Sequence, residues 1–299
     1  MIKYTTPTLE LALPRFANFK MLGQGGEGAV FAVWDRIRKT DLALKLIQDS
    51  GEEDQAKRFI FEYTTLASSP SERLVRVYDR GVGAVPFANG AEVDHHWYTM
   101  EKCESSVRTT FRRLPLRQRV DIAMQMLDGI AFLHAKSIAH RDIKPDNLFL
   151  VRGTQVKIGD FGLARAHVSL DVEEENEEPV RLGDVLGSPP YLAPERWVGV
   201  QDADWRPSDQ YAAGVTIFEL LSAGRVPLDF GTTQESYFRA HLGGRLFSLR
   251  VPEMAARELP SVDSALARMM AKRPEARYPN IAECKRELSA ALALDGAGG

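Results

Sequence analysis

The chain has 299 residues, a hydrophobic content of 44% and a formal net charge of −3 at pH 7. This length accommodates two lobes with a cleft between them. The small net charge excludes a strong attraction to nucleic acid or to an anionic membrane, so neither is expected as a partner.

Cysteine content and hydropathy indicate the compartment. Cys103 and Cys284 are the two cysteines and lie far apart in the sequence, which favours free thiols in a reducing environment. No segment approaches the roughly 20 apolar residues needed to span a bilayer, and the first residues lack a signal-peptide pattern. We therefore expect a cytoplasmic chain without a membrane span.

The first predicted element is a glycine-rich hairpin. Gly23, Gly25 and Gly28 have the spacing Gly-x-Gly-x-x-Gly, and apolar residues at 29–34 and 42–47 predict two strands after it. In a dinucleotide-binding domain this spacing would open a helix, which the strand pattern contradicts. Because glycine has no Cβ atom, such a turn lets the backbone approach phosphate oxygens closely.

A helix is predicted at about residues 54–67. Its apolar positions recur at three- and four-residue steps, which places Phe59, Glu62 and Leu66 on one inward face. A carboxylate among apolar neighbours usually needs a partner. The alternative is that Glu62 is a solvated helix residue.

The rest of the chain changes from strands to helices. Strands are predicted at 74–78 and 97–100, with a polar loop at 81–94 between them. From residue 116 onward apolar residues keep helical spacing, interrupted by two short strands at 147–151 and 155–158. A mostly apolar helix at 209–222 is predicted to be buried.

Two short motifs carry the chemistry. Residues 140–147 read His-Arg-Asp-Ile-Lys-Pro-Asp-Asn, and Asp160-Phe161-Gly162 begins thirteen residues later. With the glycine hairpin, the strand Leu-Ala-Leu-Lys at 42–45 and Gly-Ser-Pro-Pro-Tyr-Leu-Ala-Pro-Glu at 187–195, they stand in the order typical of protein kinases. The chain therefore resembles a eukaryotic-type serine/threonine protein kinase domain of bacterial kind, from residue 22 to residue 277.

This resemblance implies a fold and a division of the chain. The fold class is α+β, with a β-rich N-terminal lobe at 1–103 that carries one main helix and ends at a hinge. A mostly helical C-terminal lobe follows at 104–299, and its activation segment runs from 160 to 195.

The resemblance also implies the roles of the site residues. Asp142 would accept or orient the proton of a substrate hydroxyl, and Lys144 would steady the γ-phosphate. Lys45, paired with Glu62, would hold the α- and β-phosphates of ATP. The metal ligands would be Asn147 and Asp160, binding Mg²⁺, for which Mn²⁺ could substitute. The implied nucleotide contacts are Gly23, Gly25, Gly28, Val30, Ala43, Lys45, Met100, Glu101, Cys103 and Phe149.

The activation segment leaves one question open. Ser188 stands where the family usually has threonine, and Glu195 should pair with Arg277. Between them and Asp160, residues 171–178 contain six acids in eight residues. These acids, or Asp184, could approach Arg141 and Arg165 and partly replace a phosphate. Alternatively the run is solvated, or it selects basic substrates.

The expected function is transfer of the γ-phosphoryl group of ATP to serine or threonine hydroxyls of proteins, with autophosphorylation. The substrates could be basic around the target residue. The alternatives are a nucleotide-binding pseudokinase or scaffold, and a small-molecule kinase of related fold. Substrate identity and oligomeric state cannot be derived from these motifs.

Overall fold

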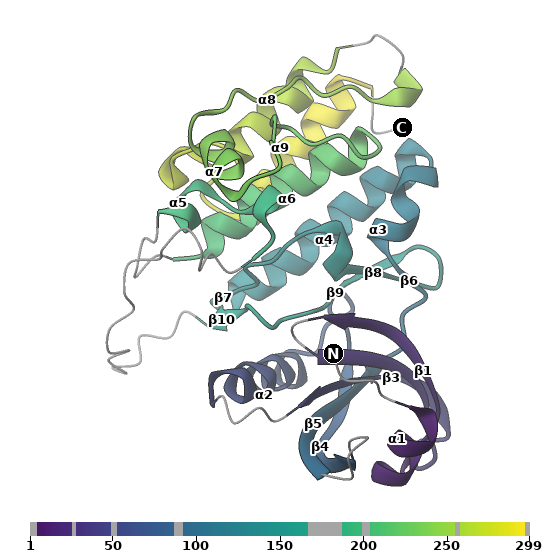
Figure 1. Ribbon diagram of the computed structural model, residues 1–299. Coiled ribbons are helices and arrows are strands. Elements are labelled where there is room, and N and C mark those ends of the chain that lie inside the picture. The colour runs from purple at the N-terminus through teal and green to yellow at the C-terminus, as the bar shows by residue number, and fades with distance from the viewer. Residues whose placement is uncertain are drawn as a thin grey trace. The chain divides into compact units, whose positions relative to one another are not determined.

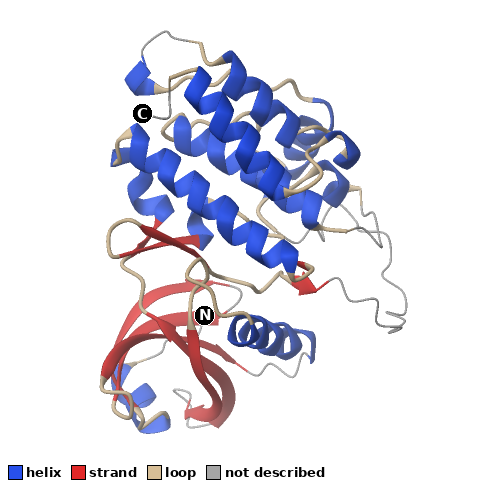
Figure 2. Ribbon diagram, turned by 180° about the vertical axis from the view of Figure 1, so that it is seen from behind, coloured by secondary structure: helices blue, strands red, loops and turns tan. Residues whose placement is uncertain are grey.

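The computed structural model describes residues 5–25, 28–48, 53–86, 92–166, 187–198, 204–254 and 258–296. The chain forms two compact units. The first unit comprises Met1–Glu104 with Asp160–Gly162, and the second comprises Ser105–Gly159 with Leu163–Gly299. Strands predominate in the first unit and helices in the second (Figure 2). The expected α+β class is confirmed, whereas the lobe boundary after residue 103 stays a prediction.

The first unit is built on an antiparallel sheet with strand order β1-β2-β3-β5-β4. Neighbouring residues on β5 point to opposite faces of this sheet. Trp97 packs in a core cluster with Leu9, and Tyr98 packs in another with Phe59. Helices α1 and α2, which supply Leu9 and Phe59, therefore cover opposite faces (Figure 1). The elements are α1 Thr6–Ala12, β1 Phe16–Gly25, β2 Gly28–Asp35, β3 Thr40–Gln48, α2 Glu53–Ser68, β4 Val77–Pro86 and β5 Glu92–Glu101.

The main helix of this unit has the inward face that its sequence pattern predicts. Phe59, Glu62 and Leu66 of α2 are all buried, with Glu62 only 1% exposed. This spacing places an acidic side chain inside the unit, where it faces the sheet rather than water. The helix thereby brings a carboxylate to the central strand.

The predicted polar loop at 81–94 is wrong, because β4 continues to Pro86 and β5 begins at Glu92. Two glycines in β4 suggested a loop, but both are required by packing in the strand. A Cβ atom on Gly81 would lie 2.4 Å from the Trp97 ring, and one on Gly83 would lie 2.4 Å from Leu13. Glycine in a strand often marks such a close approach. The helix α1 was also not predicted.

The second unit is mostly helical, with two small sheets. Its strands form the orders β6-β8-β9 and β10-β7. Its helices are α3 Val107–Thr110, α4 Leu116–Ala135, α5 Pro194–Trp197, α6 Arg206–Leu221, α7 Gln234–Gly243, α8 Pro260–Met269 and α9 Ile281–Leu294. Its strands are β6 Ser105–Ser106, β7 Ile138–Ala139, β8 Leu148–Val151, β9 Gln155–Ile158 and β10 Arg165–Ala166.

Helix α6 is the centre of the second unit. Every residue from 208 to 221 is buried, as its mostly apolar sequence predicts, and α4 and α8 pack against it (Figure 1). Gly214 allows this packing, because a Cβ atom there would lie 2.8 Å from the side chain of Met270. The predicted strands at 147–151 and 155–158 correspond to β8 and β9. Among the described residues, no helix combines the length and apolar character that crossing a membrane requires.

Substitution of Gly81 tests the reason for the extended β4. Gly81→Ala places a methyl group against the buried Trp97 ring, so we expect the free energy of unfolding to fall by about 1–3 kcal/mol, the usual cost of overpacking. Urea denaturation followed by tryptophan fluorescence measures this change. Gly23→Ala is the control, because a Cβ atom at Gly23 meets nothing within 4 Å. Equal stability of the two variants would contradict the packing explanation.

Candidate active site

A buried ion cluster lies at the middle of the first unit. Lys45 stands on the central strand β3, opposite Val30 of β2 and Tyr98 of β5. Its ammonium nitrogen lies 2.8 Å from Glu62 Oε2 and 3.1 Å from Asp160 Oδ1. The predicted pairing of Lys45 with Glu62 is confirmed. The cluster joins the sheet, the helix α2 and the 160–162 segment.

Both oxygens of the Glu62 carboxylate have a partner. Oε2 accepts from Lys45, and Oε1 accepts the backbone N–H of Phe161 at 3.0 Å. Burial alone would lower the pKa of Lys45, but the facing Glu62 and Asp160 carboxylates raise it well above its usual range. Lys45 therefore remains a cation, the form that can bind phosphate.

The glycine hairpin has the backbone freedom that its sequence predicts. Gly28 has a φ of 111°, and a Cβ atom there would lie 2.4 Å from the carbonyl oxygen of Leu46. Only glycine fits this position without strain. Gly23 and Gly25 lie in β1, and a Cβ atom on either would meet nothing within 4 Å. The tip, residues 26–27, lies outside the described residues.

The other predicted nucleotide contacts lie near Lys45 or at the end of β5. Ala43 is buried and pairs with Met100 across β3 and β5. Glu101 donates its backbone N–H to the carbonyl oxygen of Arg76 at 2.8 Å, and its own carbonyl oxygen lies 3.9 Å from the Sγ of Cys103. Cys103 is half-buried, and its thiol is not part of a disulfide. Phe149 belongs to the second unit, on β8.

The 140–147 segment of the second unit gathers polar side chains around one carboxylate. Lys144 Nζ donates to Asp142 Oδ2 and to Ser188 Oγ, both at 2.6 Å. Asn147 Nδ2 donates to the same Asp142 oxygen at 2.8 Å. Within the part of the chain that the structure describes, no hydrogen bond reaches Asp142 Oδ1. One carboxylate oxygen is thus fixed by two donors, and the other can accept a proton.

The backbone of the same segment is held by an aspartate that the sequence analysis did not identify. Asp209 on α6 is fully buried, and its Oδ2 and Oδ1 accept the backbone N–H groups of His140 at 2.8 Å and Arg141 at 2.7 Å. The Nε2 of His134 also lies 2.8 Å from Oδ2. Burial alone would raise the pKa of Asp209, but these hydrogen bonds lower it below its usual range. The carboxylate is therefore ionised at neutral pH.

The side-chain amide of Asn147, a predicted metal ligand, is held by Asp142. Its Nδ2 donates to both the backbone carbonyl and the side chain of Asp142, so its amide oxygen is directed elsewhere. Amide and carboxylate oxygens are hard donors of the kind that suit a hard divalent cation. Among the described residues, no group of three or more His, Cys, Asp or Glu could hold a metal by itself.

The predicted pair of Glu195 and Arg277 is present and bidentate. Arg277 donates to Glu195 Oε1 at 2.7 Å and to Oε2 at 2.8 Å, and Ser208 Oγ donates to Oε1 at 2.7 Å. Both members of the pair are buried. Burial would raise the pKa of Glu195, but the Arg277 guanidinium outweighs it and lowers that pKa. The pair fixes α5 at the end of the 187–195 segment.

Arg108 forms a second charged network that sequence reasoning missed. Its Nε donates to Asp146 at 3.0 Å, and its other nitrogens contact Glu219 and the hydroxyl of Tyr191. Tyr191 also donates to Glu219 at 2.6 Å. The network joins α3, α6, the 140–147 segment and the 187–195 segment. These contacts link residues more than 25 positions apart, and no local spacing indicates them.

His241 holds the 187–195 segment from another side and was also missed. Its Nε2 lies 2.8 Å from the carbonyl oxygen of Pro189, and its Nδ1 lies 2.8 Å from the hydroxyl of Tyr211. Burial lowers the pKa of His241 to about 4, so the ring is neutral at physiological pH. A neutral ring that donates from Nε2 and accepts at Nδ1 satisfies both contacts.

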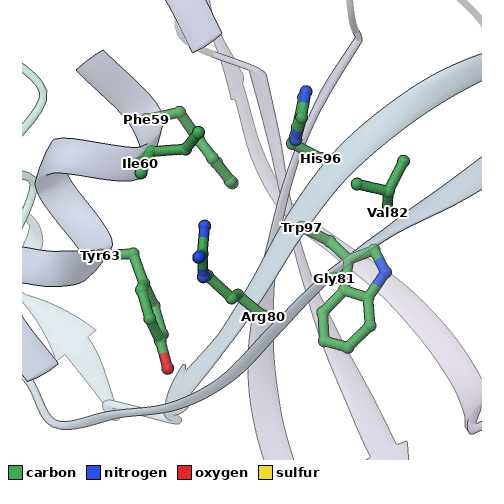
Figure 3. Close-up of a pocket in the computed structure, with 8 residues that line it drawn as sticks. All are labelled: Phe59, Ile60, Tyr63, Arg80, Gly81, Val82, His96 and Trp97. Atoms are coloured by element: carbon green, nitrogen blue, oxygen red, sulfur yellow. The ribbon is translucent and has the colours of Figure 1, made fainter. Parts of the chain in front are cut away.

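A separate pocket of about 340 Å³ lies on the first unit, lined by α2, β4 and β5. Figure 3 shows Phe59, Ile60 and Tyr63 extending from the helix, with the Arg80 guanidinium directed between the helix and His96. The Arg80 guanidinium lies 5.6 Å from the centre of the Tyr63 ring. The residues that line the pocket are mostly aromatic or apolar, together with the cation of Arg80 and the imidazole of His96.

The acidic run at 171–178 and Asp184 lie outside the described residues. Arg165 is in β10, where the structure describes only the backbone. The proposed contact between these acids and Arg141 therefore stays a prediction.

Comparisons with known proteins agree with this geometry. A family model described as "Protein kinase domain" matches residues 16–285. The chain is 29% identical to the serine/threonine-protein kinase PrkC of Bacillus subtilis, covering 94% of this chain and 41% of that protein. It is also 29% identical to the serine/threonine-protein kinase Pkn1 of Myxococcus xanthus, covering 98% of this chain and 40% of that protein. The chain thus spans about two fifths of the length of these relatives.

Removing the arginine of the buried pair tests its structural role. Arg277→Met leaves Glu195 buried without its charged partner, so we expect unfolding to become easier by about 3–5 kcal/mol at pH 7. Because the pair lowers the pKa of Glu195, its stabilisation is present above the unfolded value of about 4.3 and is lost as pH falls. Urea denaturation at pH 7 and pH 4 should show a smaller difference between wild type and variant at pH 4.

The control for this prediction is Arg286→Met, which removes an exposed arginine from α9. Exposed ion pairs contribute little to stability, so no measurable change is expected. A pH-independent effect of Arg277→Met would show that the loss does not come from the Glu195 charge.

Proposed function

Because this chain belongs to the protein kinase domain family, we propose that it is a magnesium- and ATP-dependent serine/threonine protein kinase. The family in general uses ATP and a divalent metal ion. One observation carries the proposal, namely the Asp142 carboxylate with one oxygen fixed by Lys144 and Asn147 and the other open to a proton. The names of the bacterial relatives support serine or threonine as the acceptor.

The first unit supplies the groups for the nucleotide. The glycine hairpin offers backbone N–H groups to the phosphates, and Lys45 offers a buried ammonium fixed by Glu62. Ala43 and Met100 give the apolar surface on which an adenine ring would lie, next to the carbonyl of Glu101. Burial of Lys45 strengthens its electrostatic effect on phosphate, since little water screens it.

The second unit supplies the groups for the acceptor. Asp142 accepts the hydroxyl proton at Oδ1, and the hydroxyl oxygen forms a bond to the γ-phosphorus. The bond from that phosphorus to the bridging oxygen breaks, and ADP leaves. Lys144 stabilises the charge on the transferred group, and its contact with Ser188 ties it to the 187–195 segment.

Asn147 and Asp160 are the residues that would hold the metal ion. When bound, a divalent cation neutralises charge on the β- and γ-phosphates. Among divalent cations we favour Mg²⁺, because the donors are oxygens and because it keeps several waters. Mn²⁺ would substitute for it.

Several broader expectations belong to the same proposal. The two compact units would be the two kinase lobes, with the hinge at residues 100–103. The substrates would be proteins with a serine or threonine acceptor, basic residues around the target would be favoured, and the kinase would phosphorylate itself. A cytoplasmic location is also proposed.

The alternative functions have less support. A pseudokinase typically lacks the strand lysine, the catalytic aspartate or the metal-binding aspartate, and this chain has Lys45, Asp142 and Asp160. Small-molecule kinases of related fold usually lack the Ala-Pro-Glu sequence with its arginine partner, which is present here as Glu195 with Arg277.

Incubation with labelled ATP and Mg²⁺, followed by mapping of phosphorylated residues, tests the proposed function. Label on serine or threonine of the chain and of a general protein substrate is expected. Nucleotide binding without any transfer would instead indicate a pseudokinase. Label on small molecules alone would indicate a small-molecule kinase of related fold.

Asp142→Asn tests the proposed base. The amide cannot accept the hydroxyl proton, so turnover should fall by about 10²–10⁴-fold, whereas ATP affinity should remain close to that of wild type. Steady-state rates and nucleotide titration measure the two effects. Asp121→Asn, an exposed change on α4, should leave both unchanged. Undiminished turnover of Asp142→Asn would remove Asp142 from this role.

Lys45→Met tests the nucleotide site. The change removes the ammonium from the phosphates and leaves Glu62 without its charged partner, so kcat/KM for ATP should fall by at least about tenfold. Lys20→Met, which removes an exposed lysine of β1, is the matched control. Full autophosphorylation by Lys45→Met would contradict the assignment, provided that circular dichroism shows both variants to be folded.

A further inference from the structure

Arg141, the residue before the proposed base, has a strained backbone. Its φ is 69°, in the left-handed region that residues with side chains rarely adopt. Such a conformation persists when surrounding contacts determine it. Because Asp142 is the next residue, the contacts that hold Arg141 also determine where the carboxylate lies.

The backbone of Arg141 is held at both ends. Its N–H donates to Asp209 Oδ1 at 2.7 Å, and its carbonyl oxygen accepts from Arg196 at 3.4 Å. Arg196 belongs to α5 and is buried. The geometry of Arg141 therefore depends on α6 through Asp209 and on α5 through Arg196.

The side chains of both arginines lie on one tryptophan. The guanidinium carbon of Arg141 is 4.9 Å from the centre of the Trp205 ring, and that of Arg196 is 5.1 Å from it. Trp205 precedes α6 by one residue and is half-buried. An aromatic face attracts cations through its quadrupole, and tryptophan does so most strongly. One ring thus binds two cations that would otherwise repel each other.

We propose that Trp205 is a positioning residue for the phosphoryl-transfer step, acting through Arg141 and Arg196 on Asp142. This inference rests on the proposed function, since it assigns Asp142 as the base. Trp205 fixes the Arg141 side chain directly and fixes the Arg196 donor that holds the Arg141 carbonyl. The ring supplies this restraint without a negative charge, so it adds to any contact that an anion makes with these arginines.

Two substitutions separate the aromatic face from the bulk of the side chain. Trp205→Leu keeps an apolar side chain but removes the cation-binding face, so kcat should fall by about 5- to 30-fold. The KM for ATP should stay within about twofold, because most of the proposed nucleotide contacts lie in the first unit and, among the described residues, Trp205 contacts none of them. Trp205→Phe retains an aromatic face and should restore most of kcat.

A matched control removes a comparable contact elsewhere in the second unit. The Lys136 ammonium lies 5.5 Å from the Phe132 ring at the end of α4, and that ring is half-buried like Trp205. Phe132→Leu should leave kcat and the KM for ATP unchanged. Thermal denaturation of all three variants shows whether lost activity follows lost stability.

Hydrogen exchange provides a readout that does not require activity. The Arg141 amide, hydrogen-bonded to Asp209 in the wild type, should exchange faster in Trp205→Leu and at the wild-type rate in Trp205→Phe and Phe132→Leu. Wild-type kcat in Trp205→Leu would overturn the inference, and so would an equal loss in Trp205→Phe. If the wild type transfers no phosphate, the proposed function fails. The positioning role is then tested by the hydrogen-exchange rate of the Arg141 amide alone. An unchanged exchange rate in Trp205→Leu would overturn that role.

Discussion

The geometry of the 140–147 segment depends on hydrogen bonds to the buried carboxylate of Asp209. Its two oxygens accept consecutive backbone N–H groups, from His140 and Arg141, and one of them also meets His134. Consecutive amides point the same way only when the backbone departs from extended geometry, and the positive φ of Arg141 provides that departure. The cost of this strain, of order 1–3 kcal/mol, is offset by hydrogen bonds to an ionised group, which are among the stronger ones in proteins.

From this anchor the polar groups of the segment follow in order. The turn at 140–142 directs Asp142 toward Lys144 and Asn147, and both donate to one oxygen of its carboxylate. Lys144 also donates to Ser188, so Asp142 and the 187–195 segment share a donor. The 187–195 segment is itself fixed by the ion pair between Glu195 and Arg277 and by the hydrogen bond from His241 to the carbonyl oxygen of Pro189. The Asp142 carboxylate, the proposed base, is thereby held by elements far apart in the chain.

The sequence predicted what local spacing can encode. The inward face of α2, the burial of α6 and the glycine at position 28 all follow from periodicity or from the needs of one backbone position. The extension of β4 does not, because its glycines are explained only by Trp97 and Leu13, which come from other elements. Likewise an aspartate at the start of a helix is usually a favourable charge near the helix dipole, and nothing local shows that Asp209 instead faces inward to bind a loop.

Contacts between distant residues account for the rest of what was missed, and most of them involve charge. Two examples are the ion pair of Arg108 with Glu219 and the contacts of Arg141 and Arg196 with the Trp205 ring. Each brings together residues from separate segments of the chain. Burying charge carries a desolvation cost that pairing only partly repays, so such networks are weak evidence for stability. These networks fix the relative positions of their members, because separating a buried charge from its partner has a large free-energy cost. Lys45 illustrates this: with Glu62 bonded at both oxygens, to the ammonium and to the Phe161 amide, a shift of α2 would disturb the lysine and the 160–162 segment together. The positions of Lys45 and of the 160–162 segment are thus coupled to the position of α2. The buried charges carry a desolvation cost, and the same charges restrict these groups to one arrangement.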